Sequence, residues 1–169
     1  MQSVLLFPTA MEAAPLRALR PDLDIRVCGV GVVETARTVA RLLHDEQPSR
    51  IVLCGIAGAY DATPLGAIVQ VGVERMAGLP TQYATEYRAT LRFEAFTEVR
   101  ANTVSRVNSP AEGATIENME GAALFALCEE WGVECAEIRA ISNRVGAPRE
   151  EWNIPLATHA LAEAVAKIF

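Results

Sequence analysis

Three polar side chains, Glu12, Glu120 and Asn143, stand where chemistry is expected, because each lies at a predicted strand end or helix start. Glu12 follows the apolar run from Ser3 to Phe7 by a few residues, near the start of a short predicted helix whose dipole favours its charged form. It can hold a water molecule and act as a base there, or it can stabilise the first helical turn. The spacing leaves both interpretations open.

Glu120 and Asn143 each allow one functional and one structural interpretation. Glu120 lies one turn into a predicted helix that contains the apolar residues Gly121 to Phe125, where a carboxylate is costly unless a partner stabilises it. A diol bound through two hydrogen bonds is such a partner, whereas exposure on the outer face of the helix needs none. Asn143 directly follows Ser142 at the end of a strand-like run. Its amide can donate one hydrogen bond and accept another side by side, or it can cap a turn.

Two glycine-rich tracts also follow predicted strands. The first runs from Gly29 to Glu34 and opens a helix, but Glu34 occupies the third glycine position of a dinucleotide-binding turn, which disfavours a nicotinamide cofactor. The second is Gly55-Ile56-Ala57-Gly58. Each tract either presents N–H groups and bare backbone to a ligand or makes a tight turn that permits close packing. Motifs of nucleotide triphosphatases, serine hydrolases and common zinc hydrolases are missing from the sequence.

The elements that must position these residues alternate between β-rich runs and helical stretches, which predicts one α/β domain over residues 1–169 with a largely parallel sheet. In an open sheet of this kind, ligands bind beyond the carboxyl ends of the strands. The tract from 77 to 113 has the least regular pattern, with one candidate strand at 100–107. The other predicted strands are 3–7, 24–30, 51–54, 67–73 and 135–141, and the predicted helices are 11–19, 33–44, 119–131 and 155–168.

Composition excludes several classes of function. A chain of 169 residues with 51% apolar and 21% charged residues is typical of a folded globular domain. The net charge of −6 and the scattered basic residues argue against nucleic-acid binding. The longest apolar stretch, Ile51 to Tyr60, is too short to span a membrane, and the first residues do not form a signal peptide. The cysteines form no C-x-x-C pair and no zinc-ligand spacing, so we expect reduced thiols, no metal and a cytoplasmic protein.

Five segments, taken together in their order along the chain, resemble the purine nucleoside phosphorylase and nucleosidase superfamily. Within it, residues 116–123 and 138–146 resemble the futalosine hydrolases, which are menaquinone-pathway relatives of methylthioadenosine/S-adenosylhomocysteine nucleosidase. The resemblance covers about residues 1–74 and 100–169. The segments are Ala10-Met11-Glu12, Gly29-Val30-Gly31, Cys54-Gly55-Ile56-Ala57-Gly58, Glu117-Asn118-Met119-Glu120-Gly121-Ala122-Ala123 and Arg139-Ala140-Ile141-Ser142-Asn143.

The resemblance implies a three-layer α/β/α sandwich around a central mixed, largely parallel sheet. It also implies that Glu12 activates the attacking water, that Met119 and Glu120 hold the ribose and that Asn143 holds the purine. Further substrate-binding residues are expected at Ile56, Ala57, Gly58 and Ser105.

The activity that the resemblance implies is hydrolysis of the N-glycosidic bond of a 6-oxopurine nucleoside, with futalosine as the first candidate substrate. An amide at Asn143 suits hypoxanthine, because it can accept from N7–H while donating to O6. Such an enzyme needs no metal or organic cofactor, takes a small-molecule nucleoside and is expected to be a homodimer. Two alternatives have the same fold: a methylthioadenosine/S-adenosylhomocysteine nucleosidase and a purine nucleoside phosphorylase. A third alternative is a catalytically weakened nucleoside-binding domain, because the tract from 77 to 113 is shorter than its family counterpart.

Overall fold

A computed structural model describes residues 3–169, so the first two residues of the expected domain lie outside the described part. No helix within this range is long and apolar enough to cross a membrane. The elements follow the chain in the order β1 (Ser3–Phe7), α1 (Ala10–Leu19), β2 (Ile25–Val27), α2 (Val32–Asp45), β3 (Arg50–Ala59), β4 (Ile68–Met76), η1 (Thr81–Tyr83), β5 (Glu86–Arg88), β6 (Thr97–Thr103), β7 (Ile116–Asn118), α3 (Gly121–Trp131), β8 (Glu134–Arg144), η2 (Arg149–Glu151) and α4 (Ile154–Ala166).

The strands form one mixed sheet that curves until it closes on itself. β3 pairs with β7 on one side and with β8 on the other, while β4 pairs with β8 and with β6, and β6 pairs with β7. These five strands therefore make a barrel-like ring, and β1 with β2 extends the sheet from β3. The expected mixed sheet with parallel neighbours is present. The expected three-layer α/β/α sandwich is not confirmed, because β8 joins two strands that an open sheet would leave apart.

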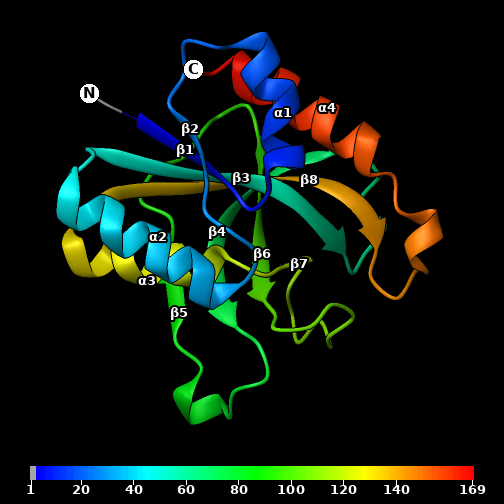
Figure 1. Ribbon diagram of the computed structural model, residues 1–169. Coiled ribbons are helices and arrows are strands. Elements are labelled where there is room, and N and C mark those ends of the chain that lie inside the picture. Colours follow the sequence, from blue (N-terminus) through cyan, green and yellow to red (C-terminus); the bar gives the residue numbers. More distant parts are fainter. Residues whose placement is uncertain (1–2) are drawn as a thin grey trace.

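The four helices form two pairs on opposite sides of this sheet (Figure 1). α1 packs against α4, and α2 packs against α3. Side chains along β1 alternate between the two sides, as the period of a strand requires. Val4 and Leu6 pack in the core beneath α2 and α3, while Leu5 and Phe7 pack in the core beneath α1 and α4. Burying each such side chain contributes about 1.5–3 kcal/mol, which fixes the helix pairs on the sheet.

Every strand and helix expected outside the tract from 77 to 113 is present. β1 has the expected bounds, and the bounds of the others differ. β2 is shorter than the expected strand, whereas β3 and β8 continue past the expected strand ends. The irregular tract contains η1, β5 and β6, and β6 begins and ends earlier than the expected strand at 100–107.

Parallel pairing of β1, β3 and β8 brings their carboxyl ends to one edge of the sheet. The loop from β1 to α1, the end of β3 and the end of β8 therefore meet there, as expected for an α/β protein. The short strand β7 and the start of α3 approach the same place, because β7 pairs with the end of β3 at Gly58 and Ala59.

Candidate active site

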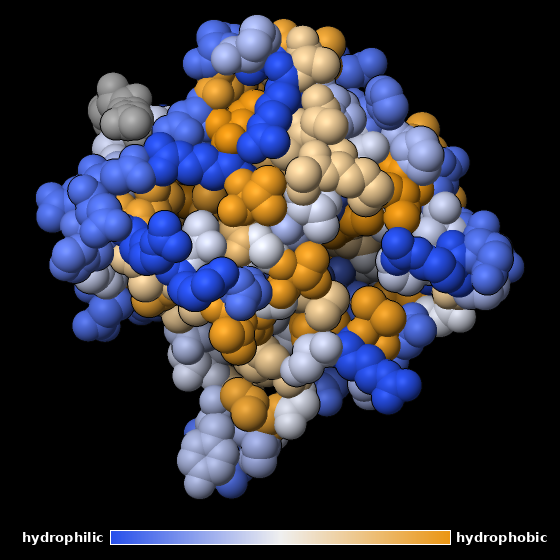
Figure 2. All heavy atoms as spheres, in the orientation of Figure 1, coloured by the Kyte–Doolittle hydropathy of each residue, from blue (hydrophilic) through white to orange (hydrophobic). Residues whose placement is uncertain are grey.

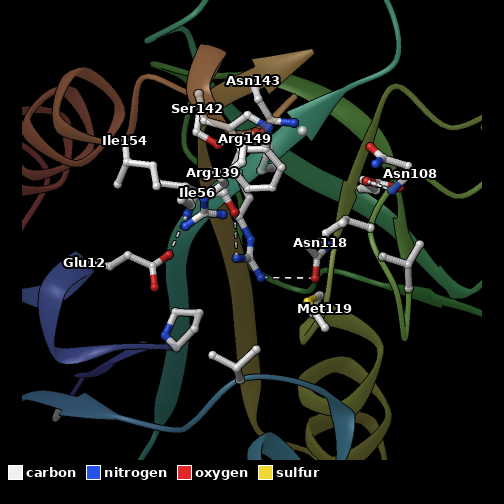
Figure 3. A pocket seen from close by; sticks show the side chains of 18 of the residues that line it. Glu12, Ile56, Asn108, Asn118, Met119, Arg139, Ser142, Asn143, Arg149 and Ile154 are labelled. Atoms are coloured by element: carbon white, nitrogen blue, oxygen red, sulfur yellow. Dashed lines mark hydrogen bonds between the residues drawn. The ribbon is translucent and has the colours of Figure 1, made fainter. Parts of the chain in front are cut away.

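A cavity of about 560 Å³ opens at this edge of the sheet, within the size range of small-molecule sites. Figure 3 shows side chains from β3, β8, the first turn of α1 and the β7–α3 junction pointing into it. Its lining comprises Pro8, Thr9, Met11, Glu12, Val30, Ile56, Ala57, Gly58, Val104, Val107, Asn108, Glu117, Asn118, Met119, Glu120, Arg139, Ser142, Asn143, Gly146, Ala147, Pro148, Arg149, Trp152 and Ile154.

Glu12 lies in the first turn of α1 and lines the cavity while almost fully buried. One of its carboxylate oxygens accepts a hydrogen bond from the Ile56 N–H at 3.0 Å, drawn in Figure 3, and the other accepts from the Thr9 hydroxyl at 2.6 Å. The Thr9 hydroxyl accepts in turn from the Glu12 N–H, so Thr9 caps the helix. Glu12 therefore takes part in the helix start and also presents a firmly oriented carboxylate to the cavity.

Glu120 is buried at the start of α3, which excludes the interpretation that it is exposed on the outer face of that helix. One carboxylate oxygen accepts from the Gly31 N–H at 3.0 Å. The other accepts from Arg139 Nη2 at 3.1 Å and from the Met119 N–H at 3.3 Å. The partner that this carboxylate requires is thus supplied by Arg139 and by the N-terminal end of α2, where Gly31 has a φ of 89° that favours glycine.

Arg139 is a buried arginine in the middle of β8 that holds several groups around the cavity together. Its Nε donates to Glu137 at 2.6 Å, and its Nη1 donates to the Ile56 carbonyl oxygen at 3.2 Å. Burial alone would lower the pKa of Arg139, but the charges of Glu137 and Glu120 raise it, so the guanidinium stays charged.

Asn118 connects Arg139 to the backbone at the start of α3. Its Oδ1 accepts from the N–H groups of Glu120 and Gly121, both at 2.8 Å, and from Arg139 Nη2 at 3.1 Å, the contact drawn in Figure 3. Because the first N–H groups of a helix have no partner within the helix, this side chain satisfies two of them. Asn118 therefore fixes the backbone that carries Glu120.

The glycines of the Gly55–Gly58 tract make room for side chains of the protein itself. A Cβ on Gly55 would lie 2.4 Å from Arg139 Nη1, and a Cβ on Gly58 would lie 3.0 Å from Asn143 Nδ2. Both glycines lie within β3, in register with Arg139 and Asn143 of β8. The expected close packing is present, but it occurs within a strand and not in a tight turn, and the space beside these two glycines is occupied by Arg139 and Asn143.

Asn143 is buried near the end of β8 and lines the cavity. Its Oδ1 accepts from the Ser142 hydroxyl at 2.8 Å, and its Nδ2 donates to the Arg144 carbonyl oxygen at 3.0 Å. A side-chain amide has two acceptor positions and two donor hydrogens, so one of each is left for a bound molecule. Asn143 caps backbone, as one interpretation expected, and also presents a donor beside an acceptor.

The structure brings almost all of the expected site residues together. Met119, Ile56 and Ala57 line the same cavity as Glu12, Glu120, Gly58 and Asn143. Ser105 is exposed in the loop after β6 and lies outside the lining, although its neighbour Val104 belongs to it.

Sequence reasoning missed the groups that hold the expected ones in place. The sequence motifs include Arg139 and Asn118 but assign neither a role. Glu117 was missed in the same way. Its carboxylate accepts from the N–H groups of Asn108 and Ser109 and so fixes the loop beside the cavity. One signal was available for Arg139. A charged residue inside an apolar strand pattern faces the core and needs a buried partner of opposite charge.

Comparison with known proteins agrees with this geometry. A model of the phosphorylase superfamily matches residues 82–169. A curated futalosine hydrolase of Thermus thermophilus is 30% identical over 175 residues, covering 83% of this chain and 78% of that protein. A solved structure of a Helicobacter pylori futalosine hydrolase mutant has a TM-score of 0.85 at 14% identity over 99% of each chain. A Campylobacter jejuni 5′-methylthioadenosine/S-adenosylhomocysteine nucleosidase has a TM-score of 0.81 at 15% identity, over 99% of this chain and 98% of that one.

The chain belongs to the phosphorylase superfamily, because the superfamily model matches more than half of it. The two solved structures show that the fold is shared with nucleosidases. Within the superfamily, the curated relative is a futalosine hydrolase, which confirms the resemblance expected from the motifs.

Proposed function

We propose that this protein is a nucleosidase that hydrolyses the N-glycosidic bond of futalosine, a 6-oxopurine nucleoside, to hypoxanthine and dehypoxanthine futalosine. The observation that carries the proposal is the meeting of Glu12, Glu120 and Asn143, far apart in the chain, around one cavity. The futalosine hydrolase relative supports the choice of substrate.

Hydrolysis breaks the bond between the ribose carbon C1′ and the purine nitrogen N9, and the bonding electron pair leaves with the purine. Positive charge develops on the ribose, so carboxylates placed beside the sugar stabilise the transition state. In this proposal Glu12 takes a proton from the attacking water, while Glu120 accepts hydrogen bonds from the ribose hydroxyls and Met119 packs on the sugar. The contacts of Glu12 with Thr9 and Ile56 hold its carboxylate in one orientation for that step.

Asn143 selects the base in this proposal. As the bond breaks, the leaving 6-oxopurine takes up a proton from solvent at N7. The carbonyl oxygen of Asn143 accepts from that N7–H, and its NH₂ group donates to O6. Adenine would instead turn its own amino group toward that NH₂ group, leaving two donors facing each other. An unsatisfied buried donor costs about 1–3 kcal/mol, which favours hypoxanthine over adenine by roughly ten- to a hundredfold.

Charges around the cavity favour water over phosphate as the nucleophile. Glu12 would repel an anionic nucleophile beside it. Arg139, which also lines the cavity, already donates to Glu120, Glu137 and Asn118, so its guanidinium is engaged within the protein. A phosphorylase needs cationic donors that are available to phosphate.

A substrate panel tests the proposal directly. The protein is incubated with futalosine, methylthioadenosine and inosine, with and without phosphate, and the free bases are resolved by chromatography. We expect hypoxanthine from futalosine at a rate that does not depend on phosphate. Phosphate-dependent release would identify a phosphorylase, release of adenine alone would identify a methylthioadenosine nucleosidase, and tight binding without turnover would identify a binding domain.

The role of Glu12 is tested in the same assay with Glu12→Gln. We expect turnover to fall by about a hundred- to ten-thousandfold with nucleoside binding retained, because general-base catalysis contributes on that scale. Glu34→Gln is the matched control, since Glu34 also lies in the first turn of a helix but is half-exposed, lies outside the cavity lining and pairs with Arg37. Equal turnover in both variants would remove Glu12 from the mechanism.

We also propose that the protein acts in the cytoplasm as a homodimer. All four cysteines are free and buried, which fits a reducing compartment. Met11, Val30 and Val33 are exposed, and Figure 2 shows hydrophobic side chains gathered on the face between α1 and α2. Covering such a patch by a second copy would bury apolar surface. Light scattering during size-exclusion chromatography gives the mass that decides between monomer and dimer.

A further inference from the structure

Two buried glutamates that the proposed mechanism does not use, Glu74 on β4 and Glu137 on β8, approach each other beside the first residue of α3. Neither residue has any exposed surface. A Cβ on Gly121 would lie 2.3 Å from Glu137 Oε2 and 2.7 Å from Glu74 Oε2. Oxygen atoms of both carboxyl groups therefore crowd one point above the bare backbone of Gly121, and any side chain at that position would collide with them.

The hydrogen bonds of these two carboxyl groups are incomplete unless one of them carries a proton. Glu137 Oε1 accepts from Arg139 Nε, but Glu137 Oε2 is buried and has no partner within residues 3–169. Glu74 accepts from the Thr103 hydroxyl at 2.5 Å and from Asn118 Nδ2 at 3.0 Å and 3.2 Å. Buried polar atoms are nearly always hydrogen-bonded, and a proton between the facing oxygens would supply the missing bond.

The charge balance of the surrounding groups requires the same proton. Four buried carboxyl groups, those of Glu12, Glu74, Glu120 and Glu137, interact with the charge of Arg139, the one buried cation within residues 3–169. Ionising all four would leave an excess of negative charge among buried groups, which is strongly unfavourable. Burial raises the pKa of Glu74 and of Glu137, and the charge of Glu137 raises the pKa of Glu74 further.

The pair reaches Glu120 by two separate routes. Glu74 accepts both contacts from the Asn118 amide, which directs the carbonyl oxygen of Asn118 toward the backbone N–H of Glu120. Glu137 holds Arg139 through Nε, which directs Arg139 Nη2 toward the Glu120 carboxylate. One route fixes the backbone of Glu120 and the other fixes its side chain.

We propose that Glu74 and Glu137 share one proton and act as a positioning pair for Glu120, holding it through Asn118 on one side and Arg139 on the other. Neither glutamate touches the substrate. The kinetic consequence of the pair rests on the proposed nucleosidase function, whereas the shared proton can be detected without any substrate.

Infrared spectroscopy at neutral pD tests the shared proton. We expect the wild-type protein to show the C=O stretch of a protonated carboxyl group, and we expect that band to be missing from both Glu74→Gln and Glu137→Gln. Glu134→Gln is the matched control, because Glu134 is an exposed glutamate on the same strand, paired with Arg50, and its loss should leave the band in place. No band in the wild type, or a band that survives in either buried variant, would overturn the proposal.

Kinetics test the positioning role. Glu137→Leu is expected to lower kcat about a hundredfold with a smaller change in KM, because a displacement of about an ångström in a catalytic group costs that much. Glu137→Gln should restore most of the loss, since its amide can accept from Arg139 and donate to Glu74. Equal kcat values for the two variants would overturn the role of the pair. If Glu137→Leu does not fold, a hundredfold loss in Glu137→Gln would overturn it instead. A wild-type protein without nucleosidase activity would refute the proposed function and leave the infrared result standing.

Discussion

Replacing Glu137 by glutamine is expected to flatten the dependence of folding stability on pH. The native protein holds one proton between Glu74 and Glu137, whereas exposed glutamates of the unfolded chain have lost theirs above about pH 6. Because the folded pKa of these carboxyl groups is raised, their contribution to stability is fully present below the unfolded pKa and is lost as pH rises toward the folded pKa. One additional proton in the native state makes the free energy of unfolding fall by about 1.4 kcal/mol for each pH unit.

In a chain of this length, a change of that size lowers Tm by roughly 3–6 °C for each pH unit. Thermal unfolding of the wild type and of Glu137→Gln, followed by circular dichroism from about pH 6 to about pH 8, measures the two slopes. The slope of the variant should be shallower by the contribution of one proton. Glu74→Gln should give the same slope, because either substitution removes the same proton, while Glu134→Gln should follow the wild type. Parallel lines for all four proteins would refute the shared proton and the charge argument behind it.

Two further substitutions test base recognition by Asn143 and the close packing of Gly55 against Arg139. Asn143→Asp should raise adenine release relative to hypoxanthine release by about ten- to a hundredfold, because the carboxylate accepts where the amide donates. An unchanged ratio of the two bases would show that Asn143 does not select the base. Gly55→Ala places a Cβ 2.4 Å from Arg139 Nη1 and should destabilise the fold by about 1–3 kcal/mol while lowering kcat. Urea unfolding and turnover measurements equal to the wild type would show that Arg139 can move aside freely.

Local pattern was sufficient to predict most of the strands and helices that end at the candidate site, with the exception of β7. Glu12, Glu120 and Asn143 could be singled out because each stands at the end of an apolar strand or at the start of a helix, and such positions meet at one edge of the sheet. Ser105 had no comparable signal, and it lies on the exposed loop.

Long-range pairing determines what the sequence did not reveal. The Gly55–Gly58 tract has the composition of a turn, yet it is held in β3 by pairing with β8, and its missing side chains make room for Arg139 and Asn143. The approach of Glu74 to Glu137 depends on the pairing of β4 with β8 across a large separation in sequence. β5 and β7 have three residues each, too few for alternation of polar and apolar residues to be recognised.

Closure of the sheet also limits how this protein can associate with other chains. The five strands of the ring have both of their edges paired along part of their length, so the sheet ends only at β2 and β5. Each of these end strands has three residues, too short to template a long backbone ladder with a second molecule. The homodimer proposed above is therefore expected to form through side-chain surfaces, and the described strands offer little edge for strand-to-strand aggregation.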